Sequence, residues 1–377
     1  MEDLVRHPGA DAVAGLPDPT FWSGRRVLVT GHTGFIGGWT CAWLHALGCD
    51  VTGYALPPLQ RSFYGSTGLG GRIGGVMADI RSRDDLAGAF SAHRPDTVIH
   101  LAGQPIVRES YERPLETFDV NLMGTVHVLE QARIHPPDAI VAMTSDKVYA
   151  PALPQRSHLE DDRLGPGDPY GNSKACCELA IEAYASSFLA PAGIGVATVR
   201  AGNVIGGGDW GADRLIPDAI RAFSAGEALS IRHPTAVRPW QHVLDAVNGL
   251  LLVAERAVRQ HAPVGAWNIG PPPGSSVDVG TLAQLLADAW QDGARVSFEP
   301  RNDFLETHYL AVDSARARGE LALVSPWTLQ QAVGHTVAWY WQVGAGADAW
   351  TLAQEQIAVY GADRAVIATA GVIPSSC

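Results

Sequence analysis

The sequence predicts a doubly wound α/β fold of the Rossmann type, in which a parallel sheet carries helices on both faces and joins a smaller C-terminal substrate-binding lobe. Between residues 21 and 200, short apolar runs alternate with stretches of helical spacing, as in sheets built from strand–helix–strand units. The first run leads into a glycine-rich turn, Thr30-Gly-His-Thr-Gly-Phe-Ile-Gly37. Such a turn is typical of the first strand–helix junction of a nucleotide-binding sheet. After Ala201 the alternation stops, which indicates a second lobe.

Each expected element rests on its own pattern. Arg26–Thr30 is a short apolar run that ends at glycines, as in a buried parallel strand. Residues 170–188 have helical spacing and follow a strand expected at residues 139–143. Further strands are expected at residues 50–54, 97–101, 195–200 and 266–269, and a third strand in chain order ends before Asp79. Further helices are expected at residues 39–47, 84–93, 118–133 and 246–258, and beyond Pro326.

The same patterns set the expected domain boundaries. Residues 21–200 are predicted to form the cofactor-binding domain, and residues 243–270 to rejoin it. Residues 201–242 and 271–340 are assigned to the smaller lobe. Residues 1–20, which are polar and rich in Pro, Ala and Asp, predict a loose arm. The Ala- and Gly-rich residues 345–377 receive no assignment.

Composition narrows the class of protein. The 377 residues carry a net charge of −12, from 27 Lys and Arg against 39 Asp and Glu, which disfavours nonspecific binding to nucleic acid. No apolar run is long enough to span a bilayer, and the N-terminal residues lack the pattern of a signal peptide. Five cysteines form no disulfide framework, and no Cys/His spacing resembles a zinc site. We therefore expect a cytoplasmic protein without a metal, a nucleic-acid partner or a membrane partner.

The glycine-rich turn is the predicted cofactor site. Gly31, Gly34 and Gly37 would permit a tight turn, the approach of backbone N–H groups to a pyrophosphate, and close packing of helix on strand. A plain structural turn is the alternative, but the position between a strand and a helix favours a dinucleotide. The residues expected to bind the cofactor are Gly31, Thr33, Gly34, Phe35, Ile36, Gly37, Tyr54, Asp79, Ile80, Leu101, Ala102, Gly103, Tyr170 and Lys174.

The end of the second strand bears on which dinucleotide binds. It reads Gly53-Tyr-Ala-Leu56, without the Asp or Glu that usually holds the ribose 2′-hydroxyl of NAD. Arg61 follows and could meet the 2′-phosphate of NADP. Asp79 could hold the adenine or simply cap a loop. We predict NAD and leave NADP open.

A second motif, Tyr170-Gly-Asn-Ser-Lys174, predicts oxidation of an alcohol. Tyr170 and Lys174 are four residues apart, so they lie on one face of the expected helix. A tyrosine has an ordinary pKa of about 10, and a neighbouring ammonium favours its phenolate, which can take a proton from a hydroxyl. Ser145, at the end of a strand, could hydrogen-bond the same hydroxyl. An exposed Tyr and Lys on an ordinary helix are the alternative.

Asp146 and Lys147 follow Ser145 directly and provide acid and base groups that alcohol oxidation alone does not need. They stand at the carboxyl end of a strand, where ligands bind in folds of this kind. Once C4 of a sugar is a ketone, its C5 proton is acidic. Lys147 is then the expected base at C5, and Asp146 the expected acid for the departing C6 hydroxyl. A salt bridge at the surface is the alternative.

With these residues in place, the chain resembles the extended short-chain dehydrogenase/reductase superfamily and, within it, the CDP-glucose 4,6-dehydratases. The resemblance covers about residues 21 to 340. Its most specific stretches are Arg200-Ala-Gly-Asn-Val-Ile-Gly-Gly-Gly-Asp-Trp210 and Val237-Arg-Pro-Trp-Gln-His-Val243. The other matching stretches are Phe21-Trp22, Val29–Phe35, Gly53–Leu56, Gln104-Pro105, Val107-Arg108, Asn121–Thr125, Thr144–Lys147, Asp168–Lys174 and Asp213–Asp218. The chain departs from the family pattern at Ile36, Gly38, Gly103 and Leu321-Ala322.

The resemblance implies an NAD-dependent hydro-lyase that converts CDP-D-glucose, or a related nucleotide hexose, to the 4-keto-6-deoxy sugar. C4 is oxidised, water is lost across C5–C6, and the hydride returns to C6. The resemblance also implies a nucleotide-sugar site in which arginines hold phosphate oxygens. The residues assigned to it are Gln104, Arg108, Asn203, Arg214, Arg238, His242 and Tyr309, although a surface position competes for Arg214. A homodimer or homotetramer built through the helices that carry Phe118 and Tyr170 is implied as well.

Two other functions share part of this pattern. An NAD-dependent nucleotide-sugar 4-epimerase would use Ser145, Tyr170 and Lys174 but has no need of Asp146 and Lys147. A non-catalytic sensor or scaffold that binds a dinucleotide would need neither Tyr170 nor Lys174, and both are present. The preferred nucleobase stays open.

Overall fold

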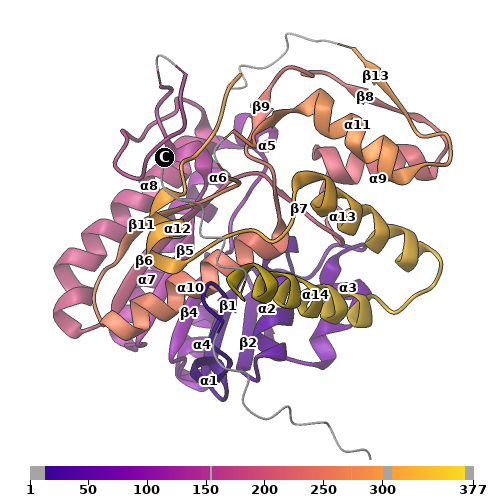
Figure 1. The fold of residues 1–377 in the computed structure, drawn as a ribbon. Helices are drawn as coiled ribbons and strands as arrows, with labels where there is room; N and C mark the ends of the chain where they lie inside the picture. Colours follow the sequence, from indigo (N-terminus) through magenta and orange to yellow (C-terminus); the bar gives the residue numbers. More distant parts are fainter. Residues whose placement is uncertain (1–12, 153–154, 273, 300–307, 370–377) are drawn as a thin grey trace, which may run out of the picture.

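A parallel sheet of seven strands forms the centre of the molecule (Figure 1). The computed structural model describes residues 13–152, 155–272, 274–299 and 308–369. In spatial order the strands run β11-β6-β5-β4-β1-β2-β3, and all neighbouring pairs are parallel. Their bounds are Arg26–Thr30 (β1), Asp50–Ala55 (β2), Gly74–Met77 (β3), Thr97–His100 (β4), Ala139–Met143 (β5), Gly195–Ala201 (β6) and Gly265–Ile269 (β11). Strand order reverses at β1 and β4, and ligands bind at the carboxyl ends of strands near such a reversal.

Helices cover both faces of the sheet, because successive side chains of a strand point to opposite sides. In β1, Leu28 packs on the face covered by α4, α7 and α8. Val27 and Val29 point to the other face, which α2 and α10 cover. The bounds of these helices are Phe35–Ala46 (α2), Arg83–His93 (α4), Gly124–Ile134 (α7), Pro169–Tyr184 (α8) and Val243–Gln260 (α10). The doubly wound arrangement predicted from the sequence is therefore confirmed.

The second lobe is built from short elements after Ala201. Its helices α9 and α11 pack on a parallel strand pair, β8 and β13, at the top of the view in Figure 1. Two shorter pairs are β7 with β10 and β9 with β12. The bounds are Val204–Ile205 (β7), Leu215–Ser224 (α9), Ala228–Ile231 (β8), Val237–Arg238 (β9), Gln241–His242 (β10), Val277–Asp278 (β12), Val279–Trp290 (α11), Arg295–Phe298 (β13) and Leu329–Gly344 (α13). Between these segments the chain returns to the large sheet, where β11 pairs with β6.

The helix expected at residues 118–133 is interrupted. The chain forms α6 (Pro114–Phe118), a π-helical turn at Asp119–Met123, and then α7. Asn121 in this turn is buried, and its amide donates to the Ser173 hydroxyl on α8 at 2.9 Å. A single wide turn shifts the hydrophobic repeat by only one residue, so the sequence spacing does not reveal it. Short α-helices elsewhere in the described chain include Pro19–Trp22 (α1), Phe63–Ser66 (α3), Val107–Glu112 (α5) and Ala315–Leu321 (α12).

The segment before β1 is packed against α10, and the loose arm expected at residues 1–20 is wrong for the residues from 13 onward. Asn248 Nδ2 on α10 donates to the Gly15 carbonyl at 2.9 Å. Glu255 Oε1, also on α10, accepts from the Asp18 N–H at 2.7 Å. Buried polar groups need hydrogen-bond partners, and this segment supplies them to α10. The residues before 13 lie outside the described part of the chain.

The unassigned C-terminal region contains a long helix, α14 (Ala349–Thr369). It packs against α2 and α13, and Ala353 and Tyr360 on it are fully buried. The Tyr360 ring meets the Trp43 ring of α2 edge to face, with centroids 5.6 Å apart. This helix therefore belongs to the core of the large lobe, and residues 370–377 lie outside the described chain.

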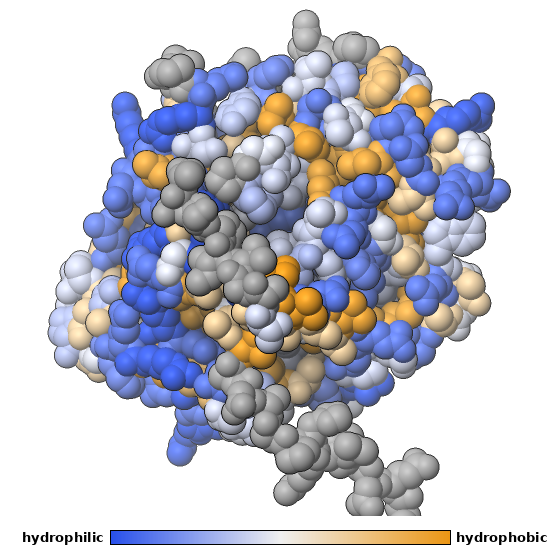
Figure 2. Space-filling model, viewed as in Figure 1, coloured by the Kyte–Doolittle hydropathy of each residue, from blue (hydrophilic) through white to orange (hydrophobic). Residues whose placement is uncertain are grey.

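Hydrophilic side chains are spread over the face of the molecule seen in Figure 2, with apolar residues in smaller groups among them. Several of the largest apolar side chains are fully buried, among them Trp22, Trp39 and Trp267. Within the described residues, each helix is too short or too polar to cross a bilayer.

The contact between α14 and α10 predicts a pH-dependent loss of stability in Tyr360→Phe. The Tyr360 hydroxyl donates to Asp245 Oδ1 at 2.8 Å, while burial raises the pKa of Asp245 to about 6. Because that pKa lies above the unfolded value, ionisation of Asp245 costs stability as the pH rises toward 6 and beyond, and the tyrosine hydrogen bond offsets part of this cost. We expect Tyr360→Phe to lose about 1–3 kcal/mol of unfolding free energy at pH 8, and less at pH 5, where Asp245 is protonated.

Urea denaturation at both pH values measures this difference. Tyr184→Phe is the control, because its hydroxyl makes only a 3.4 Å contact with Glu130 in a partly exposed position. An equal loss at pH 5 and pH 8 for Tyr360→Phe would contradict the assignment.

Candidate active site

A cavity of about 410 Å³ lies where the two lobes meet. The large lobe contributes the end of β5, from Met143 to Lys147, and Tyr170 from α8. The second lobe contributes residues of α9, β8 and β9, including Leu215, Leu229 and Arg238. The cavity therefore opens at the carboxyl edge of the sheet, where the sequence placed the catalytic residues.

The glycine-rich turn is shaped by close backbone approaches. Gly31 has φ of 78°, in the left-handed region, and a Cβ on it would lie 2.7 Å from the Ala102 nitrogen. A Cβ on Gly37 would lie 2.1 Å from the Gly31 carbonyl oxygen. The helix α2 begins at Phe35 after Gly34, which has no side chain to cap its first N–H groups. These bare N–H groups at a helix start fit the pyrophosphate of a dinucleotide.

Several of the residues expected to bind the cofactor make hydrogen bonds or ion pairs within the protein. The Tyr54 side chain is fully buried, and its hydroxyl donates to the Asp79 carbonyl at 2.7 Å. The Asp79 carboxylate is paired with Arg81 at 2.6 Å. Thr33 Oγ1 donates to the Leu56 carbonyl at 3.0 Å. The roles of these side chains at a cofactor stay predictions.

Other predicted cofactor residues lie near the turn. The N–H groups of Leu101 and Ala102 both donate to Thr30 Oγ1 at 3.1 Å, which fixes the end of β4 beside β1. Lys174 Nζ lies beside Gly103, 3.0 Å from where a Cβ would stand. Phe35 and Ile36 line the cavity. Ile80 is buried against Gly124 of α7.

Arg61, the residue considered for a 2′-phosphate, stacks over the ring of Trp210 at 5.4 Å. This contact belongs to the second lobe rather than to the end of β2. The structure therefore adds no support for NADP.

The predicted catalytic residues come together at the end of β5 and the start of α8. Ser145 Oγ donates to Asp146 Oδ1 at 3.2 Å and accepts from the Lys147 N–H at 3.1 Å. Burial raises the pKa of Tyr170 to about 12, and the neighbouring Ser145 hydroxyl opposes that rise. Burial also lowers the pKa of Lys174, which makes its proton easier to lose. Lys147 and Lys174 are the only two lysines of the sequence.

Asp146 is suited to hold a proton. It is buried, and burial raises the pKa of its carboxyl, although Lys147 and Arg238 act in the opposite direction. Its Oδ2 has no hydrogen-bond partner among the residues that the structure describes. A surface salt bridge, the alternative considered for the Asp146–Lys147 pair, does not fit a carboxyl in this position.

Arginines and carboxylates face one another in the part of the cavity toward the second lobe. Arg108, Asn203, Arg214 and Arg238 all line it, as the sequence predicted. Arg214 is paired with Asp209 at 3.1 Å, and Arg108 lies 3.6 Å from Asp213. Sequence reasoning missed both carboxylates. Their position inside the matching stretches was the available signal.

Three residues predicted to bind substrate lie outside this lining. His242 is fully buried, its Nδ1 accepts from the Leu244 N–H, and its ring packs on Trp327, so it caps α10 instead of facing the cavity. The placement of His242 at the substrate is therefore wrong.

The Gln104 side chain donates to Thr117 Oγ1 at 3.1 Å. Tyr309 pairs through its backbone with Val237, next to Arg238, so a substrate role for it stays a prediction.

Comparison with known proteins agrees with this geometry. Residues 27–270 match the model of the NAD dependent epimerase/dehydratase family. The chain belongs to this family. The chain is 39% identical over 351 residues to the CDP-glucose 4,6-dehydratase of Salmonella typhimurium, covering 91% of this chain and 98% of the relative. The dTDP-glucose 4,6-dehydratase of Streptomyces griseus is 30% identical over 269 residues, 71% of this chain and 76% of the relative.

Solved structures support the same family fold. MoeE5 in complex with UDP-glucose and NAD is 27% identical, with a TM-score of 0.72 over 85% of this chain and 99% of that chain. The UDP-glucose 4-epimerase of Thermotoga maritima has a TM-score of 0.73 at 23% identity over 85% of this chain and 99% of that chain, a likeness of fold alone. The resemblance inferred from the sequence and its NAD cofactor class are confirmed at the level of the family.

The close approach at the turn predicts the effect of Gly37→Ala. The added Cβ meets the Gly31 carbonyl at 2.1 Å, so the turn must open and its N–H groups must move. We expect NAD to bind at least about tenfold more weakly, as measured by quenching of tryptophan fluorescence.

Gly34→Ala is the matched control, because its Cβ would lie 3.2 Å from the same oxygen and needs a smaller shift. The assignment fails if Gly37→Ala binds NAD as tightly as the unmodified protein.

Proposed function

We propose that the protein is an NAD-dependent nucleotide-sugar 4,6-dehydratase, a hydro-lyase that acts on CDP-D-glucose or a related nucleotide hexose. The observation that carries the proposal is the buried acid Asp146, which lies beside Ser145 at the end of β5 in a chain 39% identical to a CDP-glucose 4,6-dehydratase. Such an acid is needed for loss of water and not for oxidation of an alcohol.

Oxidation at C4 uses Ser145, Tyr170 and Lys174. Bound NAD would accept the hydride from C4 and return it at C6. Tyr170, as the phenolate, takes the proton of the C4 hydroxyl, and Ser145 holds that hydroxyl by a hydrogen bond. Because burial raises the pKa of Tyr170 to about 12, a positive charge near the phenolate is essential. The Arg214 guanidinium acts in this direction, and we assign the same role to the Lys174 ammonium.

Loss of water uses the next two residues. Lys147 takes the proton from C5, which the C4 ketone makes acidic. Asp146 gives its proton to the C6 hydroxyl as this group departs. The raised pKa of Asp146 supports this role, because the carboxyl must still hold its proton when the reaction begins.

The diphosphate of the substrate would lie among the arginines of the second lobe. Arg214 and Arg238 offer planar groups that match phosphate oxygens, and both line the cavity. The diphosphate would compete with Asp209 for Arg214, since this pair stands 3.1 Å apart. Arg108, from α5 of the large lobe, would face the hexose.

A 4-epimerase is the second candidate, and the comparisons offer it some support. The chain is 29% identical over 341 residues to the UDP-glucose 4-epimerase of Yersinia pestis. An epimerase would leave Asp146 and Lys147 without a task, which is why we prefer the dehydratase. A non-catalytic sensor is disfavoured because Tyr170 lines the cavity together with Phe35 and Ile36, and Lys174 lies beside Gly103.

We also propose that the enzyme works in the cytoplasm as a homodimer or homotetramer. Apolar side chains are exposed on the helices expected to form the interface: Leu115 on α6, Met123 in the π-helical turn and Leu179 on α8. A monomeric mass by light scattering would refute the oligomer.

Incubation with CDP-glucose and NAD tests the proposed reaction directly. We expect a product lighter by one water, and in deuterated water it should carry deuterium at C5, because the C5 proton is exchanged at Lys147. An isomer of unchanged mass would identify an epimerase instead.

Lys147→Ala should separate oxidation from loss of water. We expect the cofactor to become reduced, seen as NADH absorbance, while product formation falls by about 10²–10⁴-fold. Lys174→Ala, which removes the other lysine, should suppress the reduction as well. Normal turnover of Lys147→Ala would refute its role as the C5 base.

A further inference from the structure

Glu178 extends the row of catalytic residues along α8. Tyr170, Lys174 and Glu178 follow one another at intervals of four residues, so they share one face of the helix. Glu178 is buried, with 6% of its surface exposed, and the proposed reaction gives it no chemical task. A buried carboxylate is costly unless its oxygens are hydrogen-bonded, so its partners are informative.

Its four hydrogen-bond donors come from β6 and from the residue that follows β5. Oε1 accepts from the Thr144 hydroxyl and from Arg200 Nε at 3.0 Å. Oε2 accepts from the Thr198 hydroxyl at 2.8 Å and from Arg200 Nη2 at 2.9 Å. Thr198 and Arg200 belong to β6, whereas Thr144 directly precedes Ser145 at the end of β5. The carboxylate therefore joins the helix of Tyr170 and Lys174 to the residue next to the catalytic serine.

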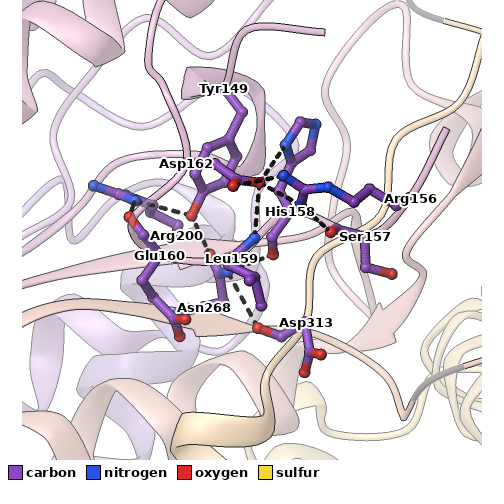
Figure 3. Close-up of polar contacts among 10 residues, drawn as sticks. All are labelled: Tyr149, Arg156, Ser157, His158, Leu159, Glu160, Asp162, Arg200, Asn268 and Asp313. Atoms are coloured by element: carbon purple, nitrogen blue, oxygen red, sulfur yellow. Dashed lines mark hydrogen bonds and ion pairs between the residues drawn. The ribbon is translucent and has the colours of Figure 1, made fainter. Parts of the chain in front are cut away.

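Arg200 continues the connection to the segment after Lys147. Its Nη1 donates to the Tyr149 hydroxyl at 2.9 Å and to the Glu160 carbonyl at 2.7 Å (Figure 3). The Tyr149 hydroxyl in turn donates to Asn268 Oδ1 at 2.6 Å, on β11. The Tyr149 ring is stacked on His158, with the planes 4° apart. Asp146 and Lys147 thus lie between two anchored positions, Thr144 and Tyr149.

We propose that Glu178 is a positioning residue of the reaction: through Thr144 it sets the place of Ser145 relative to Tyr170 and Lys174, and through Arg200 it steadies the segment that carries Asp146 and Lys147. This inference rests on the proposed function, since it assumes that these five side chains act on one substrate. The oxidation step needs the serine and tyrosine oxygens on the same substrate hydroxyl, and small misplacements of reacting groups slow catalysis strongly.

A purely structural role is the competing interpretation, because buried ion pairs also hold elements together. Replacement of Glu178 itself does not distinguish the two, since it would leave the Arg200 guanidinium buried and unpaired. The two threonines offer a matched test. Each is buried and donates one hydroxyl hydrogen bond to Glu178, but only Thr144 adjoins the catalytic serine.

The experiment compares Thr144→Val with Thr198→Val in the full chain with NAD and CDP-glucose. Both variants should lose similar thermal stability. We expect Thr144→Val to lower kcat by about tenfold or more with KM nearly unchanged, because the serine shifts while substrate contacts in the second lobe persist. Thr198→Val should keep kcat within about twofold of the unmodified enzyme, and Thr144→Ser, which retains the donor, should recover most of the lost rate.

Equal kcat values for the two valine variants would overturn the proposal, whether both match the unmodified enzyme or both fall alike. A failure of Thr144→Ser to recover the rate would also overturn it. The proposed function is tested separately in the same series, because an unmodified protein that does not release water from CDP-glucose fails before any variant is compared.

Discussion

Ionisable side chains are buried together at one edge of a parallel sheet, and this constraint shapes the rest of the molecule. Asp146, Tyr170 and Lys174 are each at least nine-tenths hidden from solvent at the end of β5 and the start of α8. Removal of water disfavours their charged forms, so it raises the pKa of the Asp146 carboxyl and lowers the pKa of the Lys174 ammonium. Hydrogen-bonding groups of the protein must therefore take the place of the water that these side chains have lost. The hydrogen bonds of Glu178 and Arg200 form one such group next to these residues.

The part of the cavity toward the second lobe contains arginines and carboxylates. Two arginines that line the cavity are already paired with carboxylates, Arg214 of the second lobe with Asp209 and Arg108 of α5 with Asp213. An anionic ligand must therefore compete with these carboxylates for the arginines. A chain with a net charge of −12 can hold a diphosphate in this way while its overall field repels polyanions such as nucleic acid.

The sequence was sufficient for the large lobe because its signals are local. Apolar runs that end at glycines located β1 and its turn, and the four-residue spacing placed Tyr170 and Lys174 on one helical face. The strand end at Met143 brought Ser145 to the same edge. Contacts between distant segments could not be predicted from such local patterns. His242 carries no mark that distinguishes a helix cap from a ligand, and the burial of residues 13–20 depends on polar groups of α10, more than 200 positions later.

The C-terminal helix and the substrate lobe show the same limit. α14 packs against α2 and α13 with one face, yet the apolar Val359 and Val366 on it are exposed, so apolar spacing does not mark its buried side. Its tyrosine reaches a carboxyl on α10. The pairing of Asp209 and Asp213 with arginines is seen only in the folded structure. Such pairings are products of tertiary structure, and spacing along the chain does not encode them in any simple form.

The scarcity of lysine has a practical consequence. Since Lys147 and Lys174 account for all the lysine in the chain, every other side-chain cation except protonated histidine is a guanidinium, which does not react as a primary amine. Acylating or aldehyde reagents would find only these two nitrogens besides the chain's amino terminus. Covalent labelling of amines, ordinarily scattered across a protein surface, is here confined almost entirely to the proposed active site.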